Sequence, residues 1–352
     1  MIAEADIKFP DIPFGKTALL IVIGMAVYLG YLYMVGFDSV KEVLLHADYR
    51  YIGLAMLVAL TGNGFHTAGW WVYLKSKDYR IPLIKAYQMY LASIFFVNLL
   101  PTMAVSGEVS KIYFVQKSTP GSRFDKTLAT CVISRVLEII PIATGAAIGV
   151  LYLAFFYGMP IWATAFCLFV AGVMAALAAG GLMVAMDNIL LRRLSASGFR
   201  LVGRLLKRDF APFAQHLDVI LTQFDASLKD ITGNRLLVAC SIILIFTAWC
   251  FDVSIAYIAF LAIGQPVAPV LVVTVFSVMV ILQMLPIFLP GGIGVVDIVM
   301  TTLYMTVGIP MESAAGATIM VRFVTLWFLT TVGGLATLYL VKAHGKNDGK
   351  LE

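Results

Sequence analysis

Charged side chains are scarce in this sequence. They make up 13% of the 352 residues, whereas hydrophobic residues make up 61%, and the mean hydropathy is +0.93. Soluble domains carry about 25% charged residues, so the composition excludes an ordinary water-soluble domain. Apolar runs close to the roughly 20 residues that cross a bilayer recur along the chain. The composition therefore predicts an all-α polytopic membrane protein.

Motifs for nucleotide hydrolysis and for nucleophilic chemistry are also missing. The sequence has neither a complete G-x-x-x-x-G-K-[ST] phosphate loop nor a GxSxG turn. The histidines are scattered, and the cysteines lie in apolar runs, where packing is their usual role: Cys131, Cys167, Cys240 and Cys250. We expect no cofactor, no metal, no catalytic residue, no ATP hydrolysis and no nucleic-acid partner.

The placement of basic residues predicts how the chain crosses the membrane. Taken alone, the apolar runs would give nine crossings. However, residues 75–85 and 111–126 each hold four basic residues against one acid, so both are predicted to be cytoplasmic. A full crossing by 83–100 would put them on opposite faces. We therefore predict that 83–117 forms a re-entrant helical hairpin that enters from the cytoplasm and turns at "LPTMAVSG".

The second half of the sequence repeats this pattern with the opposite orientation. The stretch "LQMLPIFLPGGIGVVD" interrupts an apolar run, and 267–308 is predicted to be a hairpin that enters from the outside. Gly107 precedes Arg135 by 28 residues, and Gly294 precedes Arg322 by the same 28. We predict an inverted repeat with two hairpins, about six full transmembrane helices and both termini in the cytoplasm.

A polar segment separates the two predicted halves. Residues 1–186 form the first half and 236–352 the second, while 187–235 holds eight basic residues against five acids and is predicted to be cytoplasmic. From Phe210 to Ile231 its apolar residues fall at spacings of three and four. This spacing predicts an amphipathic helix that packs on the protein or lies in the membrane interface.

Ionisable residues inside the apolar runs are the candidate binding residues, because each costs about 2.5–3.5 kcal/mol at the centre of a spanning helix. Arg135 and Glu138 could form a local pair three residues apart. Alternatively, Glu108 meets Arg135, which leaves the guanidinium able to bind a phosphate. Asp297 and Arg322 would form the equivalent pair in the second half, as a binding site or a structural lock.

Glycines precede both candidate pairs. Gly291, Gly292 and Gly294 tolerate positive φ, and a helix that starts after them points free N–H groups inward, which attracts anions. The same is predicted for Gly107 before the short helix that contains Lys111. A tight turn without a ligand is the alternative.

Other polar and aromatic residues are assigned simpler roles. We expect Asn63, His66 and Asp252 to make interhelical hydrogen bonds rather than to relay protons. Trp70, Trp71, Tyr73, Tyr87 and Tyr90 lie near helix ends, and we expect them to act as membrane-interface anchors.

At "LLPTMAVSGEVSKIYFVQK", "SRVLEII", "LPGGIGVVDIVM" and "VRFV" the chain resembles the lysylphosphatidylglycerol synthase transmembrane family, whose flippase-like module also occurs as stand-alone proteins. Members often have a glycine pair before the first acid, commonly aspartate, whereas here Val105, Ser106 and Gly107 precede Glu108. The resemblance implies a lipid translocase. By position it assigns Glu108, Lys111 and Arg135 to the first motif, and Gly291, Gly292, Gly294, Asp297 and Arg322 to the second.

The resemblance and the two halves together predict a lipid flippase of the cell membrane. Its substrate would be a lipid with a phosphate-containing or aminoacylated head group, held between the hairpin tips and moved by alternating access. We expect no synthase domain in this chain. The alternatives are an intramembrane lipid-modifying enzyme with Glu108 or Asp297 as base, and a scaffold for a separate synthase or glycosyltransferase. A homo-oligomer is compatible with each of these functions.

Overall fold

The computed structural model is helical, which confirms the all-α prediction. It describes residues 14–100, 105–119, 121–156, 158, 160–186, 226–284 and 289–348, and these residues contain no strand. The first half comprises α1 Phe14–Val35, α2 Phe37–Leu45, α3 Tyr49–Ser76, α4 Leu83–Leu99, α5 Val105–Ser118, α6 Phe124–Phe156 and α7 Ile161–Met186. The second comprises α10 Arg235–Ala262, α11 Pro269–Met284, α12 Val295–Thr306, α13 Met311–Arg322 and α14 Leu329–Asp348. A turn of 3₁₀ helix, Pro290–Gly292, precedes α12, and a π-helical segment, Phe323–Phe328, joins α13 to α14.

Long apolar helices give the protein a surface suited to a bilayer. By length and hydropathy, three helices of the described residues can cross a membrane, 124–156, 235–262 and 311–343, and the bent pair α1–α2 would make a fourth. Large apolar side chains are exposed along them, including Phe155, Leu236 and Leu335. Such a surface needs lipid or protein to cover it. The number of about six spanning helices stays a prediction.

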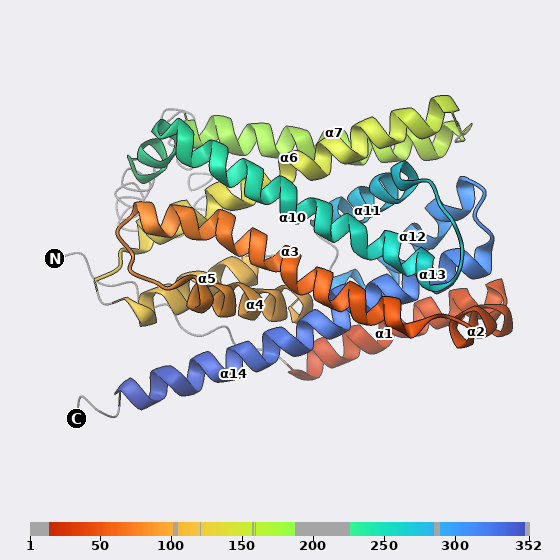
Figure 1. Cartoon of the computed structure of the whole chain (residues 1–352), viewed down its shortest axis with the longest axis horizontal. Helices are drawn as coiled ribbons and strands as arrows, with labels where there is room; N and C mark the ends of the chain where they lie inside the picture. The colour runs from red at the N-terminus through yellow and green to blue at the C-terminus, as the bar shows by residue number, and fades with distance from the viewer. Residues whose placement is uncertain are drawn as a thin grey trace, which may run out of the picture.

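Three pairs of helices pack along one another in the bundle (Figure 1). α3 packs along α10, α4 along α14, and α6 along α11. Glycines let the last two pairs approach closely. A Cβ atom added to Gly333 of α14 would clash with the Leu91 carbonyl oxygen of α4. A Cβ atom added to Gly149 of α6 would clash with the Thr274 side chain of α11. Small residues at such contacts are typical of helix pairs in membranes.

The interrupted segments lie in opposite halves of the molecule. In Figure 1, α4 and α5 lie in the left half and α11 and α12 in the right half. α5 has 14 residues and α12 has 12, so at about 1.5 Å per residue neither reaches across a hydrocarbon core of about 30 Å. The connecting residues 101–104 and 285–288 lie outside the described part of the chain.

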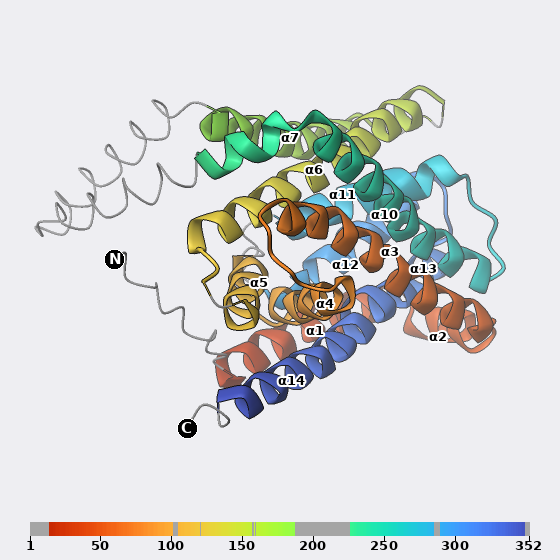
Figure 2. The ribbon, with the colours of Figure 1, turned by 60° about the vertical axis from the view of Figure 1, so that its left-hand side comes forward.

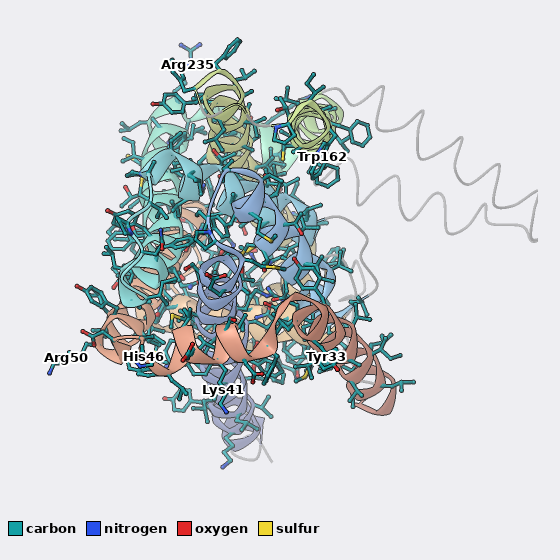
Figure 3. All side chains as sticks on the ribbon, turned by 90° about the vertical axis from the view of Figure 1, so that its right-hand side faces the viewer. Tyr33, Lys41, His46, Arg50, Trp162 and Arg235 are labelled. Atoms are coloured by element: carbon teal, nitrogen blue, oxygen red, sulfur yellow. The ribbon has the colours of Figure 1, made fainter. Side chains whose placement is uncertain are left out.

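The N-terminal helices bend sharply. α1 and α2 meet at 97°, and Gly36 between them has φ +114°, a conformation that residues with a side chain rarely adopt. Figure 3 views this end of the bundle, where Arg50 at the start of α3 points outward. Figure 2 draws α1 and α14 at the lower edge of the bundle, and the contacts of α1 are with α2, α12 and the turn Pro290–Gly292.

Most of the predicted polar segment, residues 187–225, lies outside the described part of the chain. Residues 226–233 are helical, and two apolar residues of the predicted stripe, Leu228 and Ile231, are buried against Tyr73 and Ile133. At this end of the segment the apolar face therefore packs on the protein.

Candidate functional site

Asp297 and Arg322 form a buried ion pair, as the sequence predicts. Arg322 Nε lies 2.9 Å from Asp297 Oδ1, and the two side chains are 5% and 6% exposed. Arg322 Nη2 also donates to the Gly291 carbonyl at 2.6 Å. The Gly294 N–H donates to Asp297 Oδ2 at 2.8 Å. Both carboxylate oxygens thus have partners, and backbone groups fix the pair at the start of α12.

The glycines before α12 adopt the positive φ angles that were predicted. Gly291, Gly292 and Gly294 have φ +55°, +67° and +87°. A Cβ on Gly294 would lie only 2.6 Å from the carbonyl oxygen of Gly24, so α1 can touch this turn only because both residues are glycine. The helix start was predicted to attract an anion, and here Asp297 supplies a carboxylate to it.

Gly107 serves close packing rather than an unusual backbone conformation. It lies within the first turn of α5, and a Cβ would come within 2.4 Å of Val97 Cγ2 and 3.0 Å of the Ser93 carbonyl oxygen on α4. Neighbouring Ser106 donates to the Phe96 carbonyl at 3.0 Å. The two arms of the first interrupted segment are thereby held against each other.

A cavity of about 110 Å³ lies beside the Asp297–Arg322 pair. Its walls combine that pair with apolar and aromatic side chains: Met25, Tyr28, Leu29, Ile293, Ile319, Leu326 and Trp327. Met25, Leu29 and Trp327 are also exposed at the outer surface of the bundle. The Tyr28 hydroxyl is buried, and it has no hydrogen-bond partner among the described residues. The cavity therefore offers one unused polar group next to a charged pair.

Lys111 is buried in the first half of the chain. Its Nζ lies 2.7 Å from Glu108 Oε2, and the Lys111 side chain is 3% exposed. The same Nζ lies 5.2 Å from the ring centres of Trp70 on α3 and Tyr90 on α4, within the range of cation–π attraction. The prediction that these two aromatic residues anchor the chain at the membrane interface was wrong, since both are buried inside the protein. The same holds for Tyr73.

Arg135 pairs with Glu138 on its own helix, as in the local alternative. Nη1 lies 2.9 Å from Glu138 Oε2, while Tyr90 donates to Glu138 Oε1 at 3.2 Å. The expected meeting of Glu108 and Arg135 is replaced by the Glu108–Lys111 and Arg135–Glu138 pairs, because each acid finds a base one helical turn away. Arg135 remains 33% exposed, and among the described residues its hydrogen bonds reach Glu138 only.

His66 joins Glu138 to the second half of the chain. Its Nε2 lies 2.8 Å from Asp252 Oδ2 on α10, and its Nδ1 lies 3.7 Å from Glu138 Oε1 on α6. The expected interhelical hydrogen bond is confirmed for His66 and Asp252. It is wrong for Asn63, whose amide donates to the Ala59 carbonyl within α3. Sequence reasoning did not place His66 and Asp252 with the candidate site, although isolated ionisable residues in apolar helices were a signal.

These residues form two groups, one in each half of the bundle. We call the first the His66 cluster: Glu108, Lys111, Arg135, Glu138, His66 and Asp252. The second is the Asp297–Arg322 pair with its glycine turn. The turn Pro290–Gly292 packs against the end of α4, where the Asn98 carbonyl oxygen approaches Gly291. The inner ends of the two interrupted segments therefore touch.

Comparison with known proteins gives the family. The chain matches a family model described as the lysylphosphatidylglycerol synthase TM region over residues 17–333. A UPF0104 membrane protein of Pyrococcus horikoshii is 24% identical over 331 residues, 92% of this chain and 97% of the relative. One from Methanothermobacter thermautotrophicus is 22% identical over 324 residues, 92% and 95% of the two chains. The glycosyltransferase AglD of Haloferax volcanii is 26% identical over 252 residues, 67% of this chain and 40% of that protein. This membrane protein therefore belongs to the lysylphosphatidylglycerol synthase TM region family.

Proposed function

We propose that this protein moves a lipid with a phosphate-containing or aminoacylated head group across the cell membrane without changing it covalently. The observation that carries the proposal is the cavity beside Asp297 and Arg322. An amphiphile needs apolar walls for its chains and a polar group for its head, and this cavity has both. Engineered cavities of about 150 Å³ bind a molecule the size of benzene. A cavity of about 110 Å³ thus suits one part of a lipid, with the remainder in the bilayer.

The arrangement of the helices supports movement rather than static binding. We propose that α4–α5 and α11–α12 are re-entrant hairpins that enter from opposite faces and meet at Asn98 and Gly291. The packing of α4 on α14 has its counterpart in the packing of α6 on α11, as expected if the second half repeats the first in inverted orientation. Such repeats rearrange around a central site and expose it alternately to each face.

The distribution of charge supports the orientation. The end of α3 and the starts of α6 and α10 lie at the left end of Figure 1, which carries the basic segments 75–85 and 111–126. We propose that this end is cytoplasmic. The opposite end carries α2 and the start of α3, where three acids offset Lys41 and Arg50.

Reconstitution into liposomes tests the proposal. Phosphatidylglycerol and its lysyl ester, each with a fluorescent acyl chain, are followed with a membrane-impermeant quencher of the outer leaflet. The parent protein should speed the exchange of at least one lipid. Arg322→Ala should slow it about tenfold or more, since a hydrogen bond to a charged group is worth about 1.5–3 kcal/mol. Arg322→Lys should retain part of the rate, because the charge remains without the planar fork.

Controls separate a binding role from loss of the fold. Arg235→Ala removes an exposed arginine and should leave the rate unchanged. The double variant Asp297→Asn with Arg322→Gln removes both charges together and thus avoids an unpaired buried acid. If every Arg322 variant matches the parent, the pair is a structural lock. A new lipid product would make the protein an enzyme, and neither movement nor product would favour a scaffold for a separate synthase or glycosyltransferase.

A further inference from the structure

The His66 cluster has unequal numbers of acidic and basic groups. Glu108, Glu138 and Asp252 supply three carboxylates, whereas Lys111 and Arg135 supply two cations. With a neutral imidazole, the cluster therefore carries a net charge of −1. An uncompensated charge inside an apolar bundle is costly. A proton on His66 would bring the net charge to zero.

The geometry around His66 shows where that proton would lie. Its Nε2 is hydrogen-bonded to Asp252 at 2.8 Å. Its Nδ1 is buried, and it has no hydrogen-bond partner within the part of the chain that the structure describes. If Nε2 carries the only proton, the lone pair of Nδ1 faces Glu138 Oε1 at 3.7 Å. A second proton, at Nδ1, turns this repulsion into attraction, because both nitrogens of a charged imidazole are donors.

The elements packed around His66 differ in what they contribute to this balance. Tyr90 of α4 stacks on the imidazole with ring centres 6.0 Å apart, and its hydroxyl donates to Glu138 Oε1. Arg135 of α6 holds the other oxygen of Glu138. On α5, Lys111 is already paired with Glu108, so the charge of Lys111 is balanced by Glu108 and not by Asp252. The neighbouring π-helical segment Phe323–Phe328 contains no ionisable residue.

We propose that His66 is the site at which a proton binds and couples lipid movement to the proton gradient, an inference that rests on the proposed function. His66 on α3 and Glu138 on α6 belong to the first half of the chain, and Asp252 on α10 belongs to the second. The proton on Nδ1 joins Asp252 and Glu138 through one imidazolium. Its release leaves the cluster with excess negative charge across the contact between the halves. If His66 binds a proton from one side of the membrane and releases it to the other, each rearrangement of the two halves carries one proton across.

Proton binding is tested without transport. The protein is labelled with ¹⁵N-histidine in liposomes, and the signals of His66 are assigned by their loss in His66→Gln. They should change from the neutral to the charged imidazole form as the pH is lowered, and Asp252→Asn should move the midpoint. Asp38→Asn, a change of an exposed acid, should not. An imidazole that keeps one protonation state at every pH at which the protein stays folded, or a midpoint that does not depend on Asp252, would overturn the proposal.

Coupling is tested by the ratio of lipid exchange with a proton gradient to exchange without one. The parent ratio should exceed one several-fold, His66→Gln should bring the ratio to one, and His46→Gln, at an exposed histidine, should keep the parent ratio. If the parent moves lipid with a ratio of one, the coupling role is wrong and the transport function stands. If no lipid moves under any condition, the proposed function fails and the coupling role fails with it.

Discussion

The Asp297–Arg322 pair and the His66 cluster place ionisable groups inside the same apolar bundle, but they differ in how fully those groups are satisfied. The pair has one acid and one base, about 5% exposed, and the backbone of its glycine turn binds both. The cluster has an excess acid, a third-exposed Arg135 and a histidine nitrogen without a hydrogen bond. The satisfied pair can present a fixed arginine to a lipid head group, whereas the unbalanced cluster can take up a proton.

The largest difference should appear when each arginine is removed. Arg322→Ala leaves a buried carboxylate without its cation and should lower the free energy of unfolding by about 3–5 kcal/mol. Arg135→Ala should cost about 1–3 kcal/mol, because Glu138 keeps its bond from Tyr90. Thermal unfolding in detergent measures both. Equal losses of unfolding free energy would mean that the Asp297–Arg322 pair and the His66 cluster stabilise the protein to the same extent, which would contradict the comparison.

Glycine substitutions should give the next largest difference. Gly294→Ala forces a side chain into φ +87°, which alone costs about 1–3 kcal/mol, and brings it against the backbone of α1. Gly107→Ala keeps a helical backbone and mainly pushes on Val97, at about 1–3 kcal/mol for overpacking. Gly294→Ala should therefore be the more destabilising of the two by unfolding temperature. The reverse order would show that α1 shifts to accommodate the added methyl group more easily than α4 does.

The smallest effect is expected at an ion pair whose acid is exposed and whose lysine is buried, which sets the lower limit of the comparison. Lys77 at the end of α3 contacts Asp230, whose side chain is 75% exposed. The hydrogen bond and charge of Lys77 lower the pKa of Asp230 below its ordinary value. The stabilisation is therefore present above the unfolded-state pKa of about 3.9 and is lost as the pH falls through the folded-state pKa. Lys77→Met should cost less than about 1 kcal/mol at pH 7 and progressively less in acid. A loss that persists at low pH would point to the Ser227 contact of Lys77 instead.

Hydropathy was sufficient to predict where most helices lie. The apolar runs of the sequence at 51–74 and 236–262 lie within the helices Tyr49–Ser76 and Arg235–Ala262, because burial of apolar side chains in lipid or protein sets these limits. The pairing of Asp297 with Arg322 was also predictable, since no base lies within one turn of Asp297 and no acid within one turn of Arg322. The bend at Gly36 was not predicted, because hydropathy does not report backbone direction.

The His66 cluster could not be assembled from the sequence. His66 and Asp252 are 186 positions apart, and their contact depends on how α3 crosses α10. Whether Arg135 pairs with Glu108 or with Glu138 depends on how α5 is oriented relative to α6. In the structure Arg135 pairs with Glu138, which lies one turn away on the same helix. Trp70 and Tyr90 resemble interface anchors by position, and only the packing of α5 reveals that they surround Lys111.

The π-helical segment Phe323–Phe328 changes which face of its helix meets which neighbour. In a regular α-helix, eleven residues turn through about three full revolutions and return to nearly the same face. Arg322 and Gly333 are eleven residues apart, yet the first bonds to Asp297 and Gly291 while the second touches Leu91 and Phe95 of α4. The wider turns of a π-helix shift the angular phase between the two residues. A helix of uniform pitch through this stretch would present these two residues at a different relative angle, so the irregular pitch helps to set which neighbour each of them meets.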